Sequence, residues 1–372
     1  MPRPRRLAMH VRTISSIDDL LAIKEAYVHT IGERGDSGPF YGHRWLEGCW
    51  RCLGSSESAR MFCLFSDDEL KSAVPLKFQV QRRYGIKVIV GSLMGIHLAP
   101  FGIPGGGIPD GWERALVSWL YSAELPKWTV MDLGPLTWDS MASETLLRCL
   151  KDRGLPFESR QVRYHRFRLE GDWDEFLRSQ TKHFRQTFHV KERDALVKGG
   201  LTNTRVKNPS NEVLRETVFR VAERSWQGQQ GKAISSTEKG RKFYEYLASS
   251  EGEFDVDLSL ICDGEKCASY LLGVVKDGIY YAFDTGFDAA YARYSLGYLA
   301  VWFTIRALFD EGIREFDYGI DHPYKYRYEF QCHDSSMLVL FRNRGVATVS
   351  KLWKLLRSPM ERTSLSAAPR DS

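Results

Sequence analysis

The stretch from residue 280 to residue 329 constrains the fold of this chain more than any other part. It reads as a strand at 280–284, a polar loop, an amphipathic helix from about Leu296, and a second strand at 314–318. The N-terminus of a helix leaves backbone N–H groups without partners, and the helix dipole favours anions at that end. This order of elements is typical of an α/β protein that binds a phosphorylated ligand where the helix begins.

The loop before this helix carries residues suited to such a ligand. Arg293 supplies a cation, Ser295 supplies a hydroxyl, and Gly297 lets a ligand approach the backbone closely. We therefore predict an anion site at this loop.

The composition is that of an ordinary soluble protein with room for two domains. The chain has 372 residues, of which 43% are hydrophobic and 27% charged. Its apolar runs are too short to cross a bilayer, and no apolar segment follows the basic N-terminus. The seven cysteines are scattered, as is typical of reduced thiols. We expect a cytoplasmic protein with no integral membrane association.

The two halves of the chain repeat one order of signals. In each half, three strands separated by tight turns precede a loop, a helix and a strand that ends in Asp-x-Gly, at Asp132 and at Asp317. Such repetition predicts a duplicated α/β unit. We predict a degenerate N-terminal unit at 14–165, a C-terminal unit with the ligand site at 166–350, and a mostly disordered tail at 351–372. The basic segment 1–13 is expected to be disordered.

A helix is predicted between the halves, over 173–198, with Asp172 as its N-cap. Basic side chains recur along it at helical spacing, namely Arg178, Lys182, Arg185, His189 and Arg193. A stripe of this kind is either a solvated face or a contact for a nucleic-acid backbone. The spacing alone does not separate the two.

The second half resembles a known family. A strand ending in Asp284, a loop YARYSLG at 291–297, a strand ending in FDYG at 316–319 and a YKYR segment at 324–327 are similar to the Fem-like branch of the GNAT acyltransferases, the CelD-type (cellulose biosynthesis) acetyltransferase-like family. The resemblance spans most of the chain, from about residue 38 to 330.

The resemblance implies two tandem GNAT-like units, each a mixed, mostly antiparallel sheet flanked by helices. It also implies acyl transfer, with acyl-CoA as donor, to an amine of a small molecule or of a cell-envelope or polysaccharide precursor. The loop departs from the family's Q/R-x-x-G-x-G/A pattern, because the third residue after Arg293 is Leu296 and glycine follows only at Gly297. The residues that the resemblance assigns to the donor are Tyr291, Arg293, Tyr294, Ser295 and Gly297.

Two alternatives stay open. Fem-type enzymes take an aminoacyl group from tRNA, which Arg178, Lys182, Arg185 and Arg193 would contact here. A protein that uses the same fold only to bind a partner is the other alternative.

Acyl transfer to an amine needs a group that takes the amine proton and a group that stabilises the oxyanion. Asp284 and Asp317 end strands that would flank the ligand crevice of an α/β sheet, so we predict that they act in catalysis. Lys325 and Tyr324 are predicted catalytic residues, because the basic, Tyr-rich segment suits an anion or an oxyanion. Arg327 and His322 are predicted to bind substrate. No metal-ligand spacing is present, so no metal is expected.

Overall fold

All strands of the described chain belong to one continuous sheet. In this computed structural model the described residues are 9–32, 38–54, 58–83, 86–94, 109–134, 136–137, 141–229, 234–320, 322–328 and 330–350. The sheet has 13 strands, and its order is β1-β2-β3-β4-β5-β13-β7-β12-β11-β10-β9-β8, with β6 paired to β13. The expectation of a separate sheet for each half is therefore wrong, whereas a mixed α/β sheet is confirmed.

Each half builds the same ladder within this sheet. The N-terminal half contains β1 (Met9–Ile14), β2 (Ala59–Ser66), β3 (Glu69–Arg83), β4 (Ile86–Leu93) and β5 (Val130–Asp132). The C-terminal half contains β8 (Thr202–Lys207), β9 (Asp255–Asp263), β10 (Lys266–Lys276), β11 (Ile279–Phe287) and β12 (Glu315–Ile320). In both halves the first four strands pair antiparallel and the last two pair parallel. A helix connects each parallel pair, α4 (Trp112–Leu120) or α12 (Leu296–Asp310).

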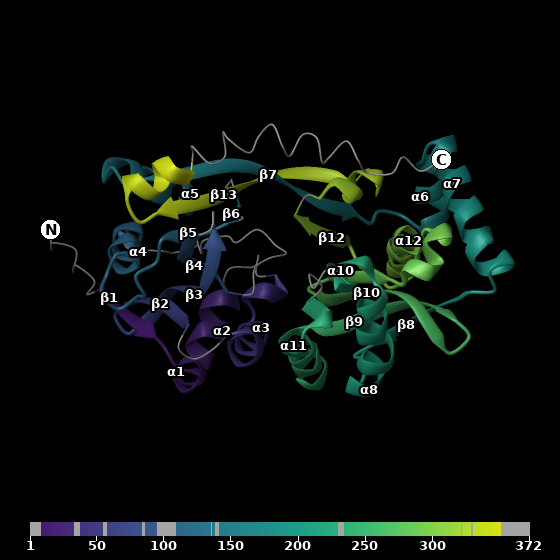
Figure 1. Cartoon of the computed structure of the whole chain (residues 1–372), viewed down its shortest axis with the longest axis horizontal. Coiled ribbons are helices and arrows are strands. Elements are labelled where there is room, and N and C mark those ends of the chain that lie inside the picture. The colour runs from purple at the N-terminus through teal and green to yellow at the C-terminus, as the bar shows by residue number, and fades with distance from the viewer. Residues whose placement is uncertain are drawn as a thin grey trace, which may run out of the picture.

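Two long strands join the halves. β7 (Phe157–Arg168) follows the N-terminal ladder in sequence but pairs with β12 of the C-terminal half. β13 (Gln331–Phe341) follows the C-terminal ladder but pairs with β5 and with β6 (Leu136–Thr137). The two strands also pair with each other, and Figure 1 shows them running together along one edge of the molecule from one half to the other. Each half thus pairs with the strand that follows the ladder of the other half in sequence.

The remaining helices cover the two faces of the sheet. They are α1 (Ile17–Ala22), α2 (Lys24–Gly32), α3 (His43–Gly48), α5 (Met141–Asp152), α6 (Trp173–Ser179), α7 (Lys182–Glu192), α8 (Asn211–Leu214), α9 (Arg220–Arg224), α10 (Trp226–Gln229) and α11 (Glu238–Ser249), with π-helical turns η2 (Cys49–Leu53), η3 (Arg193–Lys198) and η4 (Arg215–Phe219). The short 3₁₀ turns are η1 (Pro39–Tyr41), η5 (Ile234–Ser236), η6 (Ala289–Tyr294) and η7 (Pro323–Tyr328).

One hydrophobic core spans the contact between the halves. Trp45 on α3 packs edge-on against Phe243 on α11 and against Phe283 on β11, with ring centroids 5.1 and 5.4 Å apart. Figure 1 shows α3 and α11 facing each other across the middle of the molecule. A second core lies under α4 and α5, and a third lies under α6, α7 and α12.

Several elements differ from those expected. Residues 9–13, expected to be disordered, form β1 together with Ile14, because they pair with the apolar strand β2. The helix predicted over 173–198 begins as expected at the Asp172 cap but breaks at Gln180 into α6 and α7. β7 and β8 were not predicted. The glycine run at 105–107 in the loop before α4 and the tail at 351–372 lie outside the described residues. The unit boundary at 165/166 stays a prediction.

One disulfide and the lengths of the helices are relevant to the expected cytoplasmic location. Cys262 and Cys267 form a disulfide across the β9–β10 hairpin, so the expectation of reduced thiols is wrong for this pair. Within the described residues, no helix combines the length and the apolar character that a bilayer crossing requires. A cytoplasmic location stays a prediction.

Arg44 on α3 ties the halves together through the backbone of the C-terminal half. Its guanidinium is buried and donates hydrogen bonds to the carbonyls of Gly252 (2.6 Å), Phe254 (2.7 Å) and Leu247. It also lies 4.3 Å from the centre of the Phe254 ring. Burying these carbonyls without a donor would cost free energy.

We predict that Arg44→Met lowers the free energy of unfolding by about 3 to 5 kcal/mol, because the buried carbonyls of Phe254 and Leu247 lose a charged donor. Urea unfolding measures this. Arg51→Met is the matched control: its side chain is 44% exposed and pairs with Glu47 on the same helical segment. That variant should change the unfolding free energy by less than about 1 kcal/mol. Equal losses in both variants would contradict the assigned role of Arg44.

Candidate functional site

The site lies where β11 and β12 part. Their parallel ladder has three pairs and ends at Tyr281 opposite Asp317, whereas β11 continues to Phe287. The register of β10 against β11 shifts between Leu272, opposite Asp284, and Gly273, opposite Ala282. A β-bulge of this kind bends a strand away from its neighbour and leaves backbone groups unpaired. Asp284 and Asp317 therefore lie on the two strands that flank an opening in the sheet.

Asp317 is a buried carboxylate held by side chains of β7. Only 2% of it is exposed. Its oxygens accept hydrogen bonds from the Tyr164 hydroxyl, and from the Gly319 backbone N–H at 2.9 Å. The Arg166 Nε atom lies 3.3 Å from one carboxylate oxygen and 3.3 Å from Glu315. The carboxylate is thus fully provided with donors although water is excluded.

Burial decides the protonation behaviour of this cluster. Desolvation raises the pKa of Asp317 to about 6, against the lowering effects of Arg166, Tyr164 and Gly319. Burial, followed by the neighbouring charge of Asp317, raises the pKa of Tyr164 well above its usual value. Burial alone would lower the pKa of Arg166, but Asp317 and Tyr164 reverse this. Near neutral pH the cluster holds a carboxylate, a protonated phenol and a guanidinium.

The counterpart of Asp317 in the other half has a different environment. The β4–β5 ladder also has three pairs and ends at Asp132, whose carboxylate accepts from the Gly134 N–H at 3.4 Å. Arg166 is the register partner of Asp317 on β7, whereas Val339 is the register partner of Asp132 on β13. The strand that crosses into the C-terminal half brings a cation, and the strand that crosses into the N-terminal half brings an apolar residue.

Asp284 is held by a second set of hydroxyls on the same side of the sheet. Tyr244 on α11 and Tyr270 on β10 each donate to one of its oxygens at 3.0 Å, and Ser235 contacts the Tyr270 hydroxyl. Tyr244 and Tyr270 belong to the core that includes Tyr281. Burial raises the pKa of Asp284, against the lowering effect of these hydrogen bonds.

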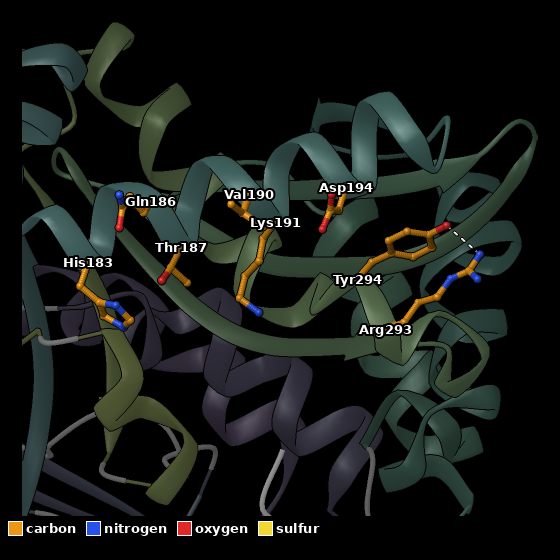
Figure 2. A pocket seen from close by; sticks show the side chains of 8 residues that line it. All are labelled: His183, Gln186, Thr187, Val190, Lys191, Asp194, Arg293 and Tyr294. Atoms are coloured by element: carbon orange, nitrogen blue, oxygen red, sulfur yellow. Dashed lines mark hydrogen bonds between the residues drawn. The ribbon is translucent and has the colours of Figure 1, made fainter. Parts of the chain in front are cut away.

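A groove of about 360 Å³ lies on the other face, at the start of α12. It runs between α7 with η3 and the loop before α12, and Figure 2 shows His183, Thr187 and Lys191 on one side of α7. Lys191 Nζ donates to Ser295 Oγ at 2.7 Å, and the ring of Tyr294 lies 4.6 Å from the Arg293 guanidinium. The residues that line the groove are His183, Gln186, Thr187, Val190, Lys191, Asp194, Arg293 and Tyr294.

The predicted donor residues do not all meet at this groove. Arg293 and Tyr294 line it, and Ser295, in a left-handed conformation with φ 54°, begins α12 beside Lys191. The Gly297 carbonyl accepts from Tyr328 at 3.1 Å. The Tyr291 hydroxyl instead donates to Asp263, at the β9–β10 turn, at 2.8 Å. Lys191 was not among the predicted residues, although its place beside the basic stripe was a usable signal.

Lys325, in the segment after β12, binds backbone carbonyls of β12. The Lys325 ammonium is buried and donates to the backbone carbonyls of Tyr318 and Ile320, the latter at 2.8 Å. The Tyr324 ring contacts both Tyr318 and His322, with the His322 ring centroid 4.6 Å away. The side chain of Arg327 and residue Asp321 lie outside the described part of the structure. A role for these residues in chemistry stays a prediction.

Two arginines of the basic stripe contact neighbouring groups of the chain. Arg185 donates to the carbonyls of Arg178 (2.9 Å) and Gln180 (2.6 Å), so it caps α6. Arg193 lies 4.0 Å from Asp194. In the described ranges, no group of three or more His, Cys, Asp or Glu side chains is arranged to hold a metal ion.

Comparisons with known proteins agree with the fold. Residues 182–326 match the family model described as an acetyltransferase (GNAT) domain. The crystal structure of FemX is similar over 88% of this chain and 98% of that one, with a TM-score of 0.55 and 12% identity. No curated protein matches the sequence significantly.

Two further solved structures share the fold. A tandem GNAT protein from the clavulanic acid biosynthesis pathway, solved without AcCoA, has a TM-score of 0.51 and 11% identity, over 89% of this chain and 98% of that one. A conserved protein of unknown function from Bacteroides thetaiotaomicron has a TM-score of 0.53 and 9% identity, over 90% and 100%. At these identities the likeness concerns the fold. With a match to a GNAT acetyltransferase domain over residues 182–326 and a GNAT-like fold, the chain is an acyltransferase.

Proposed function

We propose that this protein is an N-acyltransferase that moves an acyl group from acyl-CoA to an amine of a small molecule or of a cell-envelope or polysaccharide precursor. The observation that carries the proposal is Asp317, a buried carboxylate with a pKa of about 6 at the opening between β11 and β12. A base with a pKa near the working pH is suited to take a proton from an amine.

The groove at the start of α12 would bind the donor phosphates. Lys191, His183 and Arg293 supply charged and polar donors there, and the first turn of α12 adds free N–H groups and the positive end of its dipole. The acyl end of the donor would then reach through the opening in the sheet. Its thioester would face Asp317 and Asp284 on the other side.

The reaction moves one proton from the amine to the leaving group. The amine nitrogen forms a bond to the thioester carbonyl carbon, the C–S bond breaks, and the nitrogen loses a proton to Asp317. Asp317 then gives this proton to the leaving CoA thiolate, which restores the carboxylate. Tyr164 and Arg166 would position the Asp317 carboxylate and keep it ionised above pH 6. Asp284, held by two tyrosines, would orient the acceptor.

We predict that Asp317→Asn lowers kcat/KM by at least about 100-fold, the usual contribution of a general base. Asp132→Asn is the matched control at the same ladder position of the other half, and it should keep kcat/KM within about threefold. Steady-state acyl-CoA turnover, followed by thiol release, measures both. Equal losses would contradict the assignment of the site to the C-terminal half.

The pH profile supplies a second prediction. Asp317 acts as a base only when ionised, so kcat/KM should fall as the pH drops below about 6. Tyr164→Phe removes a donor to the carboxylate, which should move this limb upward by about one pH unit. Tyr121→Phe, which removes a hydroxyl in the N-terminal half, should leave the limb in place. If Tyr164→Phe leaves the pH of this fall in kcat/KM unchanged, the fall reports the titration of another group, and the role of Asp317 as the base is refuted.

Donor binding tests the groove directly. Each of Arg293→Ala and Lys191→Ala should weaken acyl-CoA binding about tenfold, because each loses a charged phosphate contact worth about 1.5 kcal/mol. Isothermal titration calorimetry measures this, with Lys242→Ala on α11 as an exposed, remote control. Unchanged affinity in both groove variants would rule out this donor site.

The second candidate is an aminoacyl-tRNA-dependent transferase. Its support is the exposed side of α7, where a second open groove of about 550 Å³ is lined by Lys182, Arg185 and His189. Activity with charged tRNA that disappears on RNase treatment would favour this donor. Turnover with acyl-CoA that RNase leaves unchanged would exclude it. A cytoplasmic location and roles for Lys325, Tyr324, Arg327 and His322 remain part of the proposal.

A further inference from the structure

A groove of about 700 Å³ lies beside the Asp317 cluster, beyond the end of β12. β12 pairs with β7 only from Arg168 to Tyr164, so in the described chain no strand covers this edge of β7 from Phe157 to Arg163. The lining includes Arg160, Arg163, Ile320, Tyr326, Asp334 and Met337. Ile320 is the register partner of Tyr164, so the groove begins at the residue that holds Asp317.

The two arginines of the groove differ in what faces them. Arg163 is the register partner of Asp334 on β13, whereas Arg160 is the register partner of Met337. Directly opposed residues bring their Cβ atoms within about 5 Å. The charge of Arg163 therefore has a carboxylate beside it, and the charge of Arg160 has an apolar side chain. The Arg160 side chain makes no hydrogen bond, ion pair or ring contact with another described residue.

Arg160 also shares a strand face with the catalytic cluster. Alternate residues of a strand point to the same side, which puts Arg160, Val162, Tyr164 and Arg166 on one face of β7. Arg166 and Tyr164 bind Asp317, and Arg160 lies four residues from Tyr164 and six from Arg166, about 13 and 20 Å along the strand. Glu158, the next residue on this face, has a contact of its own.

We propose that this groove binds the acceptor and selects an amine that carries an anionic group, a carboxylate or a phosphate, about 13 to 20 Å from its nitrogen. The amine lies at Asp317, and Arg160 binds the anion. An exposed guanidinium with no carboxylate of its own is suited to such a group. The assignment rests on the proposed transferase function for the amine end, whereas the anion end depends on the groove alone.

Direct binding to the full chain, without any donor, tests the anion end. Pentaglycine spans about 17 Å when extended, which lies within this range. By calorimetry it should bind at least tenfold more tightly than its C-terminal amide. Arg160→Gln should remove this preference, and Arg168→Gln, an exposed arginine on the same strand outside the groove, should keep it. An aminoalkyl phosphate of equal length that binds more tightly than pentaglycine would identify phosphate as the anion.

The outcomes separate this inference from the transferase proposal. A preference for the acid that depends on Arg160, with no acyl transfer to any amine, supports the groove and refutes the transferase. Acyl transfer with equal affinities for acid and amide refutes the groove alone. The inference is also wrong if Arg160→Gln binds as the wild type does, or if neither the carboxylate nor the phosphate probe binds.

Discussion

The contact of Tyr164 and Arg166 with Asp317 is the interaction on which the site depends. A carboxylate buried away from water is costly unless donors surround it, and here β7 brings two of them. β7 precedes the whole C-terminal ladder in sequence and meets Asp317 through its long-range pairing with β12. The base is therefore a property of the assembled chain. The core shared by α3, α11 and β11 and the buried Arg44 hold the same assembly together.

Both halves build the same ladder, and the exchange of strands explains why Asp317 has an arginine beside it whereas Asp132 has a valine. Asp132 and Asp317 end equivalent parallel ladders, and each has a glycine N–H two residues on. Their difference comes from the third strand, which presents Arg166 in one half and Val339 in the other. The same strand continues past β12 as an open edge, where Arg160 lies on the face of Tyr164. The side chains that hold Asp317 and the proposed acceptor-binding groove thus lie on two segments of β7.

Local patterns in the sequence predicted the elements around the site, and long-range pairing determined the rest. The strand, loop, helix and strand of 280–320 were predictable because apolar alternation, turn residues and a 3.6-residue period mark them. Asp284 and Asp317 were predicted as strand ends, but β11 continues to Phe287 and β12 to Ile320. β7 was not predictable, because ESRQVRYHRFR is rich in charge and lacks an apolar alternation. Tyr164, Arg166 and Arg160 were missed for that reason. The single sheet was also missed, because a strand's partner is fixed by contacts far away in sequence.

The central claim is that burial leaves Asp317 ionisable near neutral pH while Tyr164 stays protonated. Carbon-13 NMR of the chain labelled at the aspartate carboxyl carbons reads this directly, with Asp317→Asn to assign the signal. The account predicts a carboxyl that titrates with a pKa of about 6. A signal for Asp317 that titrates near 4, as in an exposed aspartate, would contradict it.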